Sequence, residues 1–130
     1  MRSATVAVSL VLSACATPAY QPLRVDLPQG LPADSYARCR DLIRGRYRFL
    51  VVEDAQAFRL QTDWVAGPNP DVASQQRVTL FREGTSVACV VEVRYLGFAM
   101  FASIPSWSAP RADVRLEEEL GDALRRALGA

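Results

Sequence analysis

The stretch that decides the fold is QQRVTLFREGTSVACVVEVRYL, residues 75–96. Both halves are rich in β-branched and aromatic residues, and the polar pair Glu83-Gly84 separates them. In the second half every other residue is apolar: Val87, Cys89, Val91, Val93 and Tyr95. Alternation over this length predicts a strand with one buried and one solvated face. We therefore predict a β-hairpin with strands at 75–82 and 86–96, joined at Glu83-Gly84.

Two further strands and two helices flank this hairpin. Alternating apolar residues predict strands at 47–51 and 58–64, separated by the polar break Glu53-Asp54. Pro32 suits a first helical turn and Gly45 a helix end, which predicts a helix over 32–44. A second helix is predicted over 110–128, where leucines recur at four-residue intervals: Leu116, Leu120, Leu124 and Leu128.

The order helix, four strands, helix predicts an α+β fold. We expect a two-layer sandwich in which a four-stranded antiparallel sheet carries both helices on one face. The other face is expected to be solvated, with Glu92 and Arg94 on it. Residues 32–130 are enough for a single modest core.

The chain before this domain divides into two parts. Residues 1–14 contain Arg2 and the apolar run Ala4 to Leu12, which is too short to span a bilayer core of about 30 Å and is typical of a cleavable export signal. Residues 15–31 hold three prolines and no sustained periodicity, which predicts a flexible tether. Alternating Leu23, Val25 and Leu27 leave open an edge strand of the domain instead.

The end of the export signal, Leu12-Ser13-Ala14-Cys15, resembles the lipobox of bacterial lipoproteins. The resemblance implies cleavage before Cys15 and attachment of lipid to that residue, with enough acyl chains for stable anchoring. Ala16 follows where an aspartate would imply retention in the inner membrane, so a Gram-negative source implies the outer membrane, facing the periplasm. An ordinary secretory signal with an incidental cysteine is the alternative.

Composition excludes several kinds of chemistry. All 15 basic residues are arginine, and the chain has no histidine. It therefore cannot form a Ser-His-Asp or Cys-His pair, a histidine zinc site or a lysine Schiff base. Without Arg2 the charges balance, which argues against a nucleic-acid partner. We expect no catalytic residue, no metal and no cofactor.

Two stretches are candidate binding sites. The first is the only local cluster of charge, which could hold phosphates or carboxylates by bidentate hydrogen bonds if it is not simply a solvated face: Arg38, Arg40, Arg44, Arg46 and Arg48. The second is the uncharged run 96–107, which either packs on the core or forms an interface. Its candidate interface residues are Phe98, Met100, Phe101 and Trp107.

Cys39 and Cys89 are the cysteines that remain once Cys15 is lipidated. Export places them in an oxidising compartment, and each lies on the expected inward face of its element. We predict a disulfide between them, and two separate buried thiols are the alternative.

These features favour a non-catalytic, lipid-anchored envelope protein that binds a protein or an envelope polymer. Residues 57–64 are similar to strand segments of lipoproteins of the β-barrel assembly machinery, which implies an accessory role in an envelope complex. The alternative is a small hydrolase or lipid-handling module that uses carboxylates and arginines.

Overall fold

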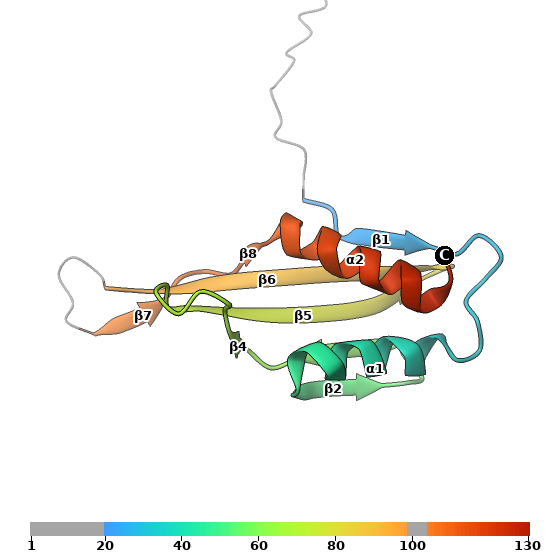
Figure 1. The fold of residues 1–130 in the computed structure, drawn as a ribbon, viewed down its shortest axis with the longest axis horizontal. Helices are drawn as coiled ribbons and strands as arrows, with labels where there is room; N and C mark the ends of the chain where they lie inside the picture. Colours follow the sequence, from blue (N-terminus) through green and yellow to red (C-terminus); the bar gives the residue numbers. More distant parts are fainter. Residues whose placement is uncertain (1–19, 99–103) are drawn as a thin grey trace, which may run out of the picture.

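The computed structural model describes residues 20–98 and 104–130 and has an α+β fold (Figure 1). In chain order its elements are β1 (Leu23–Asp26), α1 (Ser35–Tyr47), β2 (Leu50–Asp54), β3 (Arg59–Thr62), β4 (Val65–Ala66), β5 (Ser74–Glu83), β6 (Ser86–Phe98), β7 (Pro105–Trp107), β8 (Arg111–Ala112) and α2 (Val114–Leu128). No helix among the described residues is both long enough and apolar enough to cross a membrane.

The sheet is antiparallel and has eight strands in the described chain, in the order β1-β6-β5-β3-β2 with β4 paired to β5 and both β7 and β8 paired to β6. The predicted number of four strands was wrong. The four predicted strands correspond to β2, β3, β5 and β6. The others are two to four residues long, so they carry too little periodicity to be recognised in the sequence.

The hairpin of β5 and β6 is the longest pairing in the molecule and confirms the prediction from residues 75–96. It runs from Ser74 opposite Tyr95 to Glu83 opposite Ser86. Gly84 takes a positive φ of 60° in the turn, a conformation that glycine adopts without steric cost.

The segment predicted as a tether contains a strand. β1 pairs with β6, with Leu23 opposite Cys89 and Val25 opposite Val87, and the Val25 side chain is completely buried. The Leu27 N–H continues this contact by donating to the carbonyl of Thr85 at 3.0 Å. The flexible tether predicted for 15–31 therefore does not extend through Leu23–Asp26, and the edge strand that the alternation also allowed is present.

Both helices are shifted from their predicted bounds. α1 passes through Gly45 and ends at Tyr47, so the expected stop at that glycine was wrong. α2 begins at Val114 because the preceding residues form β8 and Asp113 caps the helix, its side chain accepting from the Leu116 N–H at 3.1 Å. Gly129 ends α2 with φ 72° and donates its N–H to the Arg125 carbonyl.

The strand predicted at 47–51 also lies further along the chain, as β2. Glu53 and Asp54, expected as a polar break, are in this strand and pair with Leu60 and Arg59. Two acidic residues can end this strand because β2 is at the edge of the sheet, and both of their side chains are exposed.

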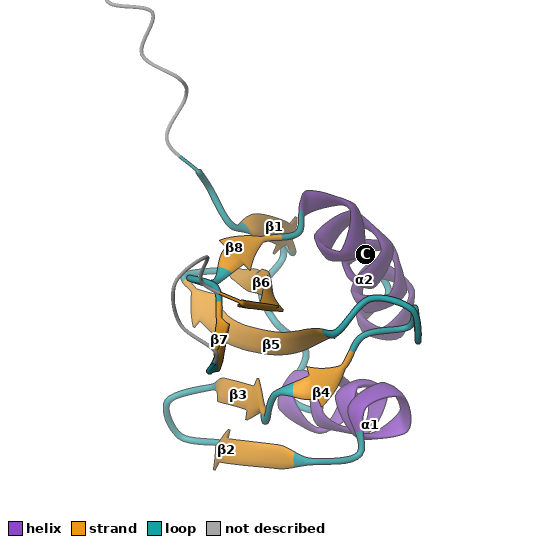
Figure 2. Cartoon of the chain, turned by 90° about the vertical axis from the view of Figure 1, so that its left-hand side faces the viewer, coloured by secondary structure: helices purple, strands orange, loops and turns teal. Residues whose placement is uncertain are grey.

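One core lies between the helices and the sheet. Figure 2 shows α1 and α2 side by side with the strands on one side of them, and the two helices contact each other. Ile43 of α1 and Leu120 and Leu124 of α2 are almost fully buried in the same cluster as the inward residues of β1, β3, β5 and β6. Tyr36 and Phe58 add an edge-to-face aromatic pair with centroids 5.5 Å apart.

Between β1 and β8, one side of the β6 backbone has no partner strand, and its hydrogen bonds go to the start of α2 instead. β1 pairs with β6 up to Cys89 and β8 from Glu92, so neither strand reaches Val91. Instead the Val91 carbonyl accepts from the Asp113 N–H at 2.8 Å, and the Val91 N–H donates to the Glu117 carboxylate at 3.1 Å. Glu117 also accepts from the Tyr20 hydroxyl. These contacts hold the beginning of the described chain against α2.

Candidate functional site

The face of the sheet opposite the core carries an arginine and tryptophan cluster. Val78, Val91 and Val93 point into the core, so the residues that alternate with them in β5 and β6 point to the other face. We call the cluster on that face the Trp–Arg surface, and it consists of Trp64, Gln75, Arg77, Glu92, Arg94 and Trp107.

Two indole rings lie against one guanidinium group. The Arg94 guanidinium carbon is 4.1 Å from the centroid of the Trp64 ring and 4.8 Å from that of Trp107. The guanidinium of Arg77 lies 4.5 Å from the Trp64 ring. All three distances are within the range of cation–π attraction. Trp64 and Trp107 come from segments more than 40 residues apart, and Arg94 connects them.

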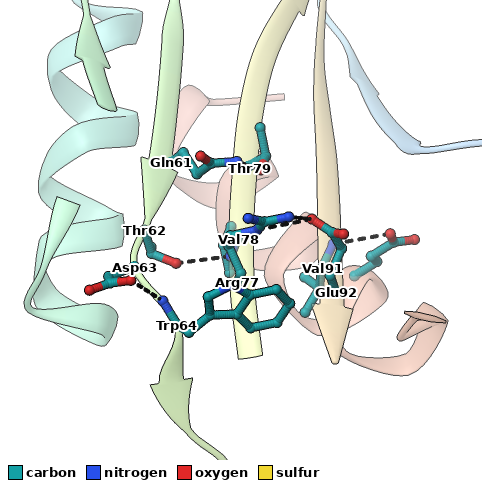
Figure 3. A network of polar contacts seen from close by, with 10 residues as sticks. Gln61, Thr62, Asp63, Trp64, Arg77, Val78, Thr79, Val91 and Glu92 are labelled. Atoms are coloured by element: carbon teal, nitrogen blue, oxygen red, sulfur yellow. Dashed lines mark hydrogen bonds and ion pairs between the residues drawn. The ribbon is translucent and has the colours of Figure 1, made fainter. Parts of the chain in front are cut away.

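Polar contacts fix the two arginines. In the register of β5 and β6, Arg77 is opposite Glu92, and its Nε and Nη2 donate to Glu92 Oε1 at 3.2 and 2.9 Å (Figure 3). Gln75 is opposite Arg94, and the Arg94 Nε donates to Gln75 Oε1 at 2.9 Å. Arg77 is thus paired with a carboxylate. Arg94 contacts a neutral amide and two aromatic rings, and so keeps a net positive charge.

The position of Trp64 follows from the end of β3. The Thr62 hydroxyl oxygen accepts from the Val78 N–H at 2.9 Å, which holds the end of β3 against β5. Asp63 then accepts the Trp64 N–H at 2.8 Å, and Figure 3 shows the indole lying over β5 beside Arg77. After Trp64 the chain pairs again with β5 as β4.

Trp107 is the member that the sequence had already identified. It lies in β7, opposite Leu96 of β6, and its side chain is 39% exposed. In its described part, the uncharged run therefore forms the end of β6 and the short strand β7 that pairs with it. Phe98 is paired through its backbone with Pro105. The predicted interface side chains of Phe98, Met100 and Phe101 lie outside what the structure describes.

The five predicted anion-binding arginines do not form one surface. Arg38 pairs with Asp34 at 2.7 Å, Arg40 with Asp41 at 3.4 Å, and Arg44 with Glu53 of β2. Arg46 and Arg48 line a shallow surface pocket together with Phe49. Because α1 directs the first four side chains around its axis, Arg48 follows its end, and acids pair with three of the five, the cluster is better described as a solvated surface of α1 and its C-terminal end.

Cys39 and Cys89 are both free thiols and both fully buried in the core, so the predicted disulfide is absent from the structure. Burial raises the pKa of each thiol to about 12, and for Cys89 the nearby charge of Glu117 adds to the shift. Neither cysteine is therefore a nucleophile in the folded protein. Among residues 20–98 and 104–130 no group of three potential ligand side chains could hold a metal ion.

Sequence reasoning missed Trp64, Gln75 and Arg77 as site residues, although the alternation of residues 86–96 assigned Glu92 and Arg94 to the open face. Arg77 comes directly before buried Val78, just as Glu92 comes directly after buried Val91, so Arg77 also belongs to the open face. The cross-strand register that joins these residues was the missing information.

Comparison of the chain with known protein families, with curated proteins and with solved structures found no match.

Proposed function

We propose that the protein is a non-catalytic, lipid-anchored envelope protein that binds an anionic envelope polymer through the Trp–Arg surface. The single observation that carries this function is the position of Arg94 between Trp64 and Trp107 on the open face of the sheet. Indole faces suit the apolar faces of sugar rings, and an arginine that pairs with no carboxylate among the described residues suits a carboxylate or phosphate group.

In this function the domain acts as a two-layer sandwich. The helices cover one face of the sheet, and the opposite face contacts the polymer. The strands on either side of Trp64, together with β6 and β7, hold the two rings and the guanidinium at fixed positions before binding. Preorganisation of this kind lowers the entropic cost of binding.

The proposed anchor is lipid on Cys15. Five residue positions separate Cys15 from Tyr20, a length that spans at most about 18 Å when fully extended. Tyr20 is held to Glu117 of α2, and the chain then enters β1 (Figure 1). A lipid on Cys15 would therefore keep the β1 edge of the sheet close to the membrane and the envelope polymer within reach of the domain.

The test is co-sedimentation of the chain from residue 15 onward, carrying Cys15→Ser, with purified peptidoglycan sacculi and separately with lipopolysaccharide vesicles. We expect Arg94→Gln and Trp107→Ala to reduce binding to one of these polymers at least tenfold. Arg126→Gln, which removes one exposed arginine from α2, is the matched control and should bind like the parent protein.

Thermal melting of each variant separates a loss of binding from a loss of folding. Equal binding by the parent, Arg94→Gln and Arg126→Gln proteins, or no binding to either polymer, would exclude the proposed function. Crosslinking in the native envelope would then identify a protein partner in place of a polymer.

A further inference from the structure

A groove lies between the end of α1 and the start of α2, over the core face of the sheet. It has two lobes that share four lining residues: Pro68, Gln76, Leu116 and Glu119. The α1 lobe, of about 480 Å³, is bordered by the end of α1 and by β4, and the α2 lobe, of about 420 Å³, by the first turn of α2 and by β6. Cavities of this size are typical of ligand sites.

The floor of the groove is a row of three residues that are paired across the sheet. Gln76 of β5 is opposite Val65 of β4 on one side and opposite Val93 of β6 on the other. Val65 lines the α1 lobe, Val93 lines the α2 lobe, and Gln76 lines both. A single amide therefore lies at the middle of the groove with an apolar residue on each side of it.

The Gln76 amide is available to a ligand. Its side chain is only 8% exposed, and its amide has no hydrogen-bond partner among the described residues. In that part of the chain no polar side-chain atom is both sealed from solvent and without a partner, so this amide opens into the groove. Amides buried to this extent are normally hydrogen-bonded. We therefore expect a ligand that offers a donor and an acceptor together at this point, as a peptide group does.

The α1 lobe is positively charged. Arg46 and Arg48 line it, and neither pairs with an acid among the described residues. The acids of the groove are already engaged, because Glu119 lies 3.3 Å from Arg115 and Asp113 caps α2. An anionic group of a ligand therefore belongs in the α1 lobe, where two guanidinium groups can donate to it.

Both lobes also expose apolar side chains. Phe49 in the α1 lobe is 65% exposed, and Val72 and Tyr95 in the α2 lobe are 42% and 44% exposed. Contact with a ligand would remove this apolar area from water, which favours binding.

We propose that the groove binds an extended peptide segment of a partner protein. An aspartate or glutamate of the peptide lies in the α1 lobe against Arg46 and Arg48. A main-chain N–H and C=O of the peptide pair with the Gln76 amide, and an apolar side chain occupies the α2 lobe. This site is on the face of the sheet opposite to the Trp–Arg surface, so the proposal does not depend on polymer binding.

The test uses a library of random heptapeptides displayed on phage, selected against the immobilised chain from residue 15 onward carrying Cys15→Ser. We expect the enriched peptides to share an acidic residue and an apolar residue, and fluorescence anisotropy of one labelled enriched peptide gives its Kd. Arg46→Gln combined with Arg48→Gln should weaken its binding about tenfold or more. Arg126→Gln, which removes an exposed arginine of α2 outside the groove, is the matched control and should bind like the parent protein.

Gln76→Met separates an amide that serves a ligand from one that serves the fold. Methionine has a similar length but no amide, so peptide binding should weaken about fivefold or more. The melting temperature should stay unchanged or rise, because the free protein loses no hydrogen bond. In the control Gln61→Met, the lost amide donates to the Thr79 hydroxyl at 2.9 Å, so the melting temperature should fall and peptide binding should not change.

Several results would overturn the proposal. These are a library without enriched peptides, enriched peptides without an acidic residue, and equal binding by the parent and the double arginine variant. A fall in melting temperature for Gln76→Met as large as that for Gln61→Met would show that the amide is structural. A parent dimer in sedimentation velocity that dissociates in the double arginine variant would place a second copy of the chain in the groove instead of a peptide.

Discussion

Gly121 of α2 lies so close to Leu23 of β1 that a Cβ atom on residue 121 would overlap the Cδ2 methyl group of Leu23. The Leu23 Cγ and Cδ1 atoms would also be within 3.5 Å of that added atom. A glycine in the middle of a helix lowers stability by about 1 kcal/mol relative to alanine. Here the glycine allows α2 to pack closely on β1. The strand formed by Leu23–Asp26 is therefore an integral part of the domain.

The first prediction is that the effect of Gly121→Ala changes sign with residue 23. In the parent chain we expect a loss of stability, because overpacking costs about 1 to 3 kcal/mol and exceeds the gain in helix propensity. In a Leu23→Ala background the same substitution should stabilise by about 1 kcal/mol. Urea unfolding of the four proteins measures both effects.

Gly45→Ala is the control for this pair. Gly45 also lies within a helix, but no atom is within 4 Å of an added Cβ there. It should raise the free energy of unfolding by up to about 1 kcal/mol. An equal effect of alanine at position 121 in both backgrounds would contradict the close packing of α2 on β1.

The second prediction concerns Glu117, whose side chain is only 2% exposed. Glu117→Ala leaves the Val91 N–H without its acceptor, which should cost about 1 to 3 kcal/mol and speed hydrogen exchange at the Val91 amide. Glu118→Gln, on the exposed face of α2, should change neither quantity. Unchanged exchange at Val91 in the Glu117 variant would show that this hydrogen bond is not formed.

Alkaline pH should destabilise the reduced protein, and this is the third prediction. Both thiols have an ordinary pKa of about 9 when unfolded, and burial raises the pKa to about 12 in the folded state. Below pH 9 both states hold these protons, so stability does not depend on them. Above about pH 9 the unfolded chain releases the protons first, and stability falls by up to about 1.4 kcal/mol per thiol for each pH unit.

Urea unfolding at about pH 8 and about pH 10 in the presence of a reductant measures this slope. Replacing both Cys39 and Cys89 with alanine should make the fall between these two values shallower. Burial also raises the pKa of Tyr36 and Tyr47 above the ordinary value of 10.0, so their contribution begins only at higher pH. A parent protein with the slope of the double variant would argue against buried thiols.

The fourth prediction is the redox state of the two cysteines. Since both thiols are free and buried, the folded protein should resist alkylation at neutral pH. After unfolding without a reductant, both Cys39 and Cys89 should react, and mass spectrometry counts the labels. If neither cysteine is labelled until a reductant is added, the disulfide predicted from export and from the number of cysteines is present.

The fifth prediction follows from the lipobox-like segment Leu12-Ser13-Ala14-Cys15. The parent protein should fractionate with membranes, and Cys15→Ser should give a soluble or unprocessed species. Cys39→Ser is a control, because that residue is buried in the core and should not affect fractionation. A parent protein that is free in the periplasm would contradict lipid anchoring.

Long periodic segments were predictable because each repeats its signal many times. The alternation of 86–96 defined β6, and the leucine stripe of α2 is buried at Leu120, Leu124 and Leu128 as the spacing predicts. The stripe also contained a clue to the buried Glu117, which lies three residues before Leu120 on the same side of the helix.

The amino-acid sequence by itself determined the α+β class, the hairpin turn at Gly84 and the apolar faces of β6 and α2, because local spacing decides these features. Only the tertiary structure decided that Leu23–Asp26 joins the sheet and that Arg94 meets both Trp64 and Trp107. Strand register and the pairing of distant segments depend on contacts between residues far apart in the chain. A two- or three-residue strand gains its stability from the neighbour on which it pairs, so its own residues carry almost no signal of it.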